Sequence, residues 1–161
     1  MIKSVIRKLT LLALAALSLA ACGRPPGHVA DVATRQIQAV ATVGMIADVV
    51  QRVGGERVAV EGLMGPGIDP HSYKASEGDV IALAEADIVF YNGLHLEAKM
   101  AEVFEKMGGT VKAVAVTDGI PREKLLTPPE FEGQYDPHVW FDVTLWQYTV
   151  GAVRDALIEI D

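Results

Sequence analysis

Two matching triplets are the residues of this sequence best suited to chemistry. Asp69-Pro70-His71 and Asp136-Pro137-His138 have the same residue types in the same order, and they contain two of the four histidines. Proline fixes its own φ at about −65° and removes a backbone donor, so it stiffens the chain just before each imidazole. A stiff approach suits a side chain that must meet a metal ion within a few tenths of an ångström. The pattern therefore indicates metal binding by His71 and His138.

The aspartates of the triplets could orient the imidazoles. Asp69 or Asp136 could accept a hydrogen bond from the imidazole nitrogen that is not on the metal, which would set the tautomer of that ligand. Another interpretation stays open, because a loop histidine is often a surface residue and Asp-Pro often opens a turn. Either interpretation fits one triplet alone. Two triplets at the same edge of one predicted sheet strengthen the case for a metal site, and both interpretations stay open on these residues alone.

The chain that must position these triplets alternates strands and helices from Gln36 onward. Glycine pairs at 54–55 and 108–109 end two of the helices, and Ser76 and Asp79 have the spacing of a capping box. Strands are expected at 37–42, 57–64, 88–91 and 112–116, and helices at 46–53, 77–86, 96–107 and from Val143 onward.

Four strands separated by helices predict an α/β fold with an open, four-stranded, mostly parallel sheet flanked by helices. Ligands of such sheets bind beyond the carboxyl ends of the strands. The first triplet follows the strand at 57–64, and the second closes the proline-rich loop 120–137 that follows the last strand. Both triplets are therefore expected at the carboxyl edge of the sheet.

The N-terminal residues have the pattern of an export signal. Three basic residues precede an apolar run at 9–21, which is too short for a membrane-spanning helix but suits a signal peptide. The run ends in Leu19-Ala20-Ala21-Cys22, which resembles a bacterial lipobox. We therefore expect a signal peptide at 1–21, a lipid on Cys22 and a flexible tether at 22–35; the alternative is an ordinary signal peptide with a chance cysteine.

Composition excludes several classes of protein. The chain has 161 residues, of which 50% are hydrophobic, so it has enough apolar material for a core. Its net charge of −7 argues against nucleic acid as a partner. One cysteine excludes an internal disulfide framework and a multi-thiolate metal site. The common nucleotide and hydrolase fingerprints are absent, and no organic cofactor is expected.

Three longer segments resemble a known family. Residues 64–73 (MGPGIDPHSY), 90–97 (FYNGLHLE) and 136–142 (DPHVWFD) are similar to the metal-binding lipoproteins of bacterial zinc and manganese ABC importers, the cluster A-I or adhesin-like solute-binding proteins. The similarity runs from about Ala39 to Ile160. It implies that His71 and His138 are metal ligands.

The resemblance also implies an architecture and a function. Family members have two α/β lobes joined by a long helix, hold the metal between the lobes, and deliver it to an ABC permease and its ATPase. Residues 36–142 would be the N-terminal lobe and 143–161 the start of the joining helix. The C-terminal lobe, absent from this chain, would supply two further ligands, a His or Glu and an Asp. The protein would be lipid-anchored at the outer face of the cytoplasmic membrane and would not be an enzyme.

The cargo implied by the resemblance is a divalent transition metal. The zinc-specialised branch of the family often has a histidine-rich loop before the second motif, whereas residues 119–136 contain no histidine. This favours manganese, or a mixed system for manganese, zinc and iron. The competing functions are a metal-dependent or flavodoxin-like enzyme, which would need a general base that is not evident, and a surface adhesin.

The remaining polar and aromatic residues of these segments have expected roles away from the metal. His95 is not a regular ligand position in the family, and we expect it at the rim of the site or partly buried. Glu97 and Asp142 are interpreted as helix-start residues, because acids favour a first helical turn. Trp140 and Phe141 are expected to pack in the core or between lobes.

Overall fold

The structure is a computed structural model that describes residues 32–107 and 109–161. The predicted signal peptide, Cys22 and the first part of the predicted tether lie outside the described residues. Among the helices of the described part, none has both the length and the apolar character needed to cross a membrane.

A four-stranded parallel sheet forms the centre of the fold, as predicted. The strand order is β2-β1-β3-β4, so the chain crosses over from the edge strand to the far side of β1. Most residues of β1 and β3 are buried, apart from Gln38 and Tyr91, and the Phe90 side chain is completely enclosed. The strands are β1 (Ile37–Val43), β2 (Val58–Met64), β3 (Ile88–Tyr91) and β4 (Lys112–Ala115).

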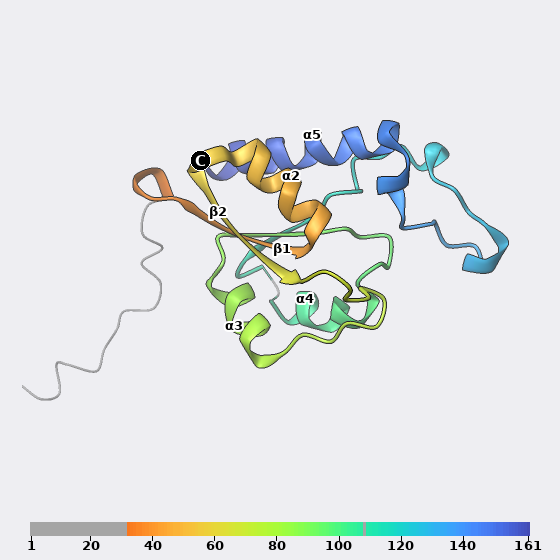
Figure 1. The fold of residues 1–161 in the computed structure, drawn as a ribbon, viewed down its shortest axis with the longest axis horizontal. Coiled ribbons are helices and arrows are strands. Elements are labelled where there is room, and N and C mark those ends of the chain that lie inside the picture. The colour runs from red at the N-terminus through yellow and green to blue at the C-terminus, as the bar shows by residue number, and fades with distance from the viewer. Residues whose placement is uncertain (1–31, 108) are drawn as a thin grey trace, which may run out of the picture. The chain divides into compact units, whose positions relative to one another are not determined.

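Helices cover both faces of this sheet. Figure 1 shows α2 and α5 together on one side of the strands, with α3 and α4 on the other. The apolar face predicted for α2 is buried at Ile46, Val49 and Val50. The helices are α2 (Gly44–Gly54), α3 (Glu77–Glu85), α4 (Ala101–Met107) and α5 (Val143–Ile160).

The helix signals in the sequence are confirmed at two helix ends and wrong at a third. Ser76 and Asp79 form the predicted capping box of α3, and α2 ends at the predicted glycine pair. The third helix begins later than expected: a 3-10 turn (Ala98–Met100) precedes α4, which starts at Ala101. The chain is not helical before this turn because Leu94 and His95 both have positive φ, at 53° and 64°.

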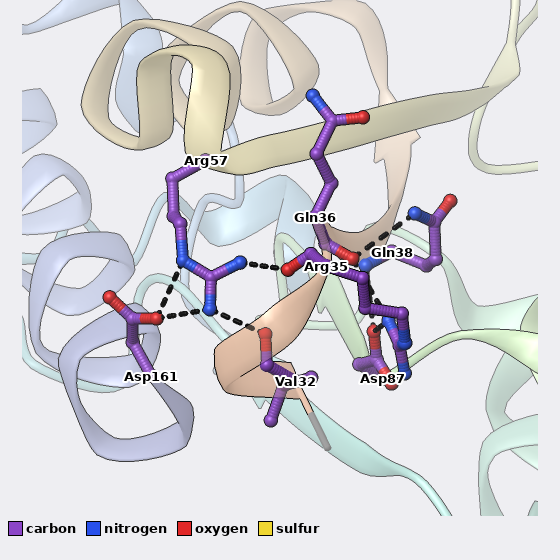
Figure 2. Close-up of polar contacts among 7 residues, drawn as sticks. All are labelled: Val32, Arg35, Gln36, Gln38, Arg57, Asp87 and Asp161. Carbon is purple, nitrogen blue, oxygen red and sulfur yellow. Dashed lines mark hydrogen bonds and ion pairs between the residues drawn. The ribbon is translucent and has the colours of Figure 1, made fainter. Parts of the chain in front are cut away.

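Residues 32–35, the last residues of the predicted tether, contact the elements around the sheet. Val32–Thr34 form a 3-10 turn. Arg57 donates to the carbonyls of Val32 and Arg35 and pairs with Asp161 at the end of α5 (Figure 2). The Arg35 guanidinium makes two hydrogen bonds to Asp87, at 2.6 and 2.7 Å. The folded part therefore includes Val32 to Arg35.

Candidate metal centre

The fold brings the two triplets together at the carboxyl edge of the sheet. The first lies in the loop after β2, and the second lies just before α5. His71 and His138 are 67 residues apart in the sequence, yet their Nε2 atoms are 3.2 Å apart. The sequence predicted this edge for both residues, and the structure places both there.

The distance between these nitrogens suits two ligands of one ion. Two imidazole nitrogens on a tetrahedral zinc, each about 2.0–2.1 Å from the metal, are about 3.3 Å from each other. The Nε2 atoms of His71 and His138 have nearly this separation, and their rings are tilted by 54° rather than stacked. The arrangement can accept a metal with little movement of either ring.

Asp136 fixes the tautomer of His138. Its Oδ1 accepts hydrogen bonds from the His138 backbone N–H at 2.9 Å and from the ring Nδ1 at 2.6 Å. Burial raises the pKa of Asp136, but these hydrogen bonds from His138 outweigh burial, so the pKa lies below its ordinary value. An ionised carboxylate can only accept, so Nδ1 carries the proton. The lone pair of Nε2 is then available to a metal.

Asp69 makes the same backbone turn without the same contact to the ring. Its Oδ1 accepts from the His71 backbone N–H at 3.0 Å, and its Oδ2 accepts from the Ser72 hydroxyl at 2.8 Å. The hydrogen bonds from Ser72 and His71 lower the pKa of the Asp69 carboxyl. Among the contacts of the described residues, Asp69 reaches His71 only through its backbone. Both triplets therefore share the hydrogen bond from the histidine backbone to the aspartate, but only in the second triplet does the aspartate also contact the imidazole ring.

Aromatic rings surround His138. The Trp140 ring meets the imidazole edge-on with centroids 5.2 Å apart, and the Phe131 ring lies 6.2 Å away. Trp140 also packs against the main core, as predicted. Phe141 is 82% exposed and takes no part in the core of this lobe. Phe131 was missed in the sequence because it lies in a proline-rich loop without periodicity.

His95 lies apart from the other two histidines. It is exposed and lines a hollow of about 370 Å³ together with Asp118, Arg122 and Tyr135. Neither His71 nor His138 lines this hollow. The expected place of His95 at the rim of the metal site stays a prediction.

The two acids interpreted as helix-start residues behave differently. Asp142 is the N-cap of α5 and accepts from the backbone N–H groups of Thr144 and Leu145, at 2.8 and 3.4 Å. Glu97 makes no such cap. Its side chain is buried, and burial raises its pKa against the opposing hydrogen bonds that it accepts. The prediction is confirmed for Asp142, whereas Glu97 stands at the N-cap position of the 3-10 turn and its side chain makes no cap there.

The candidate site has two possible ligand groups, His71 and His138, within the described residues. In 32–107 and 109–161, no cluster of three or more His, Cys, Asp or Glu side chains could hold a metal. Two imidazoles leave at least two positions open on a tetrahedral ion.

Comparisons with known proteins show the family of the chain. A family model described as "ZnuA: Zinc-uptake complex component A periplasmic" matches residues 39–161. The chain is 52% identical over 121 residues to the zinc-binding protein TroA of Treponema pallidum, covering 75% of this chain and 39% of that protein. It is 46% identical over 142 residues to the manganese-binding lipoprotein MntA of Bacillus subtilis, covering 87% of this chain and 45% of the relative.

Solved structures show the same fold. The periplasmic zinc-binding protein TroA of Treponema pallidum superposes with a TM-score of 0.73 at 50% identity, over 77% of this chain and 44% of that one. A Mn-bound periplasmic metal-binding protein of Candidatus Liberibacter asiaticus superposes with a TM-score of 0.70 at 29% identity, over 78% of this chain and 46% of that one. The chain thus spans less than half the length of these relatives.

Proposed function

Since the chain belongs to the family of the periplasmic zinc-uptake component ZnuA, we propose a role for it in metal import. We propose that it is the metal-capturing lobe of a substrate-binding protein for an ABC importer. The cargo is a divalent transition metal, manganese or zinc, with iron as a further candidate. The observation that carries this proposal is the convergence of the His71 and His138 Nε2 atoms at 3.2 Å. The names of the relatives support it, because they are described as zinc-binding and manganese-binding.

The capture step follows from the chemistry of imidazole. A neutral imidazole binds a metal through the nitrogen that has no proton. Asp136 holds the proton of His138 on Nδ1 and so leaves Nε2 ready for the ion. The carboxylate also balances part of the positive charge that the bound ion brings to the ring. Two ligands give an open site from which the ion can be passed on.

We further propose a domain organisation. Residues up to 142 form an N-terminal lobe, and 143–161 begin a helix that leads to a second lobe. That second lobe would supply the remaining two ligands, an arrangement supported by the greater length of the relatives. An ABC permease and its ATPase would be the partners that receive the ion.

The place of action in this proposal is the outer face of the cytoplasmic membrane. A lipid on Cys22 would hold the protein there, and relatives such as MntA are described as lipoproteins. Acyl chains contribute about 0.8 kcal/mol per buried methylene group, so two or more chains give a stable anchor.

Metal titration of the whole protein tests the proposed function. We expect His71→Ala and His138→Ala each to remove most of the binding of Zn²⁺ and Mn²⁺. The matched control is His95→Ala, which makes the same change at an exposed histidine outside the site and should leave affinity unchanged. Wild-type binding should also be weaker at pH 5 than at pH 7.5, because protonated imidazole cannot bind metal. Retention of wild-type affinity in both ligand variants would refute the site.

A further inference from the structure

A group of buried polar side chains lies behind the loop of His138. Burying polar groups is costly unless they form hydrogen bonds, so such a concentration requires an explanation. Four of the five buried polar residues in the described part of the chain are linked by hydrogen bonds to one another. They are Thr42, Asn92, Glu97 and Thr117.

The backbone at the centre of this group is strained. Gly93, Leu94 and His95 follow one another with positive φ, at 84°, 53° and 64°. Such a conformation costs a non-glycine residue of order 1–3 kcal/mol, so it persists only where the surroundings hold it. The left-handed turn at 93–95 therefore needs a structural cause.

The Glu97 carboxylate supplies that cause. It accepts hydrogen bonds from the backbone N–H groups of Asn92 at 2.8 Å and Gly93 at 3.3 Å. The hydroxyl of Thr42, near the carboxyl end of β1, also donates to it at 2.7 Å. The turn is thus wrapped around a buried carboxylate that is itself fixed to the central sheet.

The turn directs the Asn92 side chain to the loop of the second ligand. The Asn92 Nδ2 donates to the carbonyl of Pro137 at 3.1 Å, across 45 positions of sequence. The same carbonyl accepts from the Val139 N–H at 2.9 Å, which closes a tight turn centred on His138. The Asn92 amide thus holds the carbonyl that immediately precedes the ligand.

Packing alone does not explain an amide at this position. The Asn92 side chain is fully buried, and its Oδ1 has no hydrogen-bond partner among the described residues. An apolar side chain would avoid the cost of that unpaired oxygen. The amide Nδ2 makes two hydrogen bonds, one to the Gly93 carbonyl at 3.0 Å within the left-handed turn and one to the Pro137 carbonyl of the loop.

We propose that Asn92 is a positioning residue for the metal site, aimed by Glu97 and holding the Pro137–Val139 turn so that His138 meets the metal in the correct place. This inference rests on the proposed function, because it assumes that His138 is a ligand. A ligand must be held within about 0.5 Å of its productive position. Without the hydrogen bond from Asn92, the Pro137–Val139 turn would keep only hydrogen bonds between residues that are close in sequence.

The test is a titration of the whole protein with Zn²⁺, together with the visible absorption spectrum of bound Co²⁺. Asn92→Ala should lower the affinity for Zn²⁺ roughly ten- to hundredfold, the usual effect of losing outer support of a ligand. Asn92→Ser, whose shorter side chain cannot reach the Pro137 carbonyl, should do the same. Both should alter the Co²⁺ spectrum, which reports the geometry around the metal.

The matched control is Asp87→Asn at the opposite, amino edge of the sheet. It removes a partly buried hydrogen-bond network and should lower the melting temperature of the metal-free protein, with no change in Zn²⁺ affinity or in the Co²⁺ spectrum. A wild-type affinity and spectrum in both Asn92 variants would overturn the inference. So would loss of the folded metal-free state in both, because Asn92 would then serve the fold and not the loop. If wild type and His138→Ala bind metal equally, it is the proposed function that fails.

Discussion

At the scale of single residues, the metal site depends on how each imidazole is supported. The sequence predicted His71 and His138 from their shared context, because a repeated Asp-Pro-His after two strands is a strong local pattern. The sequence left open whether either aspartate contacts the imidazole ring of its histidine, since both triplets have the same residues in the same order. The structure separates them: Asp136 contacts the Nδ1 of its histidine, whereas Asp69 contacts a backbone N–H and Ser72.

This difference predicts unequal effects of two matched substitutions. Asp136→Ala should weaken Zn²⁺ binding roughly ten- to hundredfold, because His138 loses the group that fixes its tautomer and ring orientation. Asp69→Ala should cause a clearly smaller loss, because it removes only a turn contact. Isothermal titration calorimetry of both variants provides the comparison. Equal losses would show that ring support by Asp136 has no special role.

Asn92 could not be found from the sequence for a physical reason. Its partner, the Pro137 carbonyl, is a backbone atom distant in sequence, and no side-chain pattern marks it. Glu97 was misread for a related reason: an acid near a helix start has a local explanation, whereas its burial depends on the folded chain. Contacts between distant segments are thus the part of the site that local patterns do not show.

At the scale of elements, the sheet and its helices follow closely from local signals. Glycine pairs, a capping box and alternating apolar residues gave most element bounds to within one or two residues, because these effects act over a single turn. The late start of α4 was not predicted, since the left-handed turn before it is held by Glu97 and Thr42. The contacts of residues 32–35 were not predicted either, because their partners lie far along the chain.

The pair between Arg35 and Asp87 predicts a pH dependence of stability. Hydrogen bonds from Arg35 hold the pKa of Asp87 below its ordinary value, against the opposing effect of burial. The folded state therefore favours the ionised carboxyl, and this contribution is complete above the unfolded-state pKa of about 3.9. It is lost as pH falls through the lower, folded-state pKa.

We expect Asp87→Asn to lower the free energy of unfolding by about 1 kcal/mol at pH 7, a modest value because water screens part of the pair. The difference between wild type and variant should shrink below about pH 4. Urea denaturation at a series of pH values measures it. A difference that stays constant down to pH 2 would contradict the assigned role of this ion pair.

At the scale of the whole molecule, the site and the start of the folded part lie at opposite edges of the sheet. The histidines follow the carboxyl ends of strands, whereas Arg35 and Asp87 directly precede β1 and β3.

The proposed anchor predicts where the whole protein is found in cells. Cys22→Ser should move it from the membrane fraction to the soluble fraction, because a serine cannot take the thioether-linked lipid. Ser18→Ala is a matched control that changes the same leader and leaves the Leu19–Cys22 sequence intact. Fractionation followed by immunoblotting provides the measurement. A Cys22→Ser protein that stays with the membranes would disprove the anchor.

The most direct test of the central claim is an anomalous difference map of crystals of the whole protein loaded with zinc and measured at the zinc absorption edge. We predict one strong peak between the two imidazoles, about 2.0–2.1 Å from both the His71 and the His138 Nε2 atoms. A zinc peak that lies away from these nitrogens, or that touches only one of them, would contradict the account.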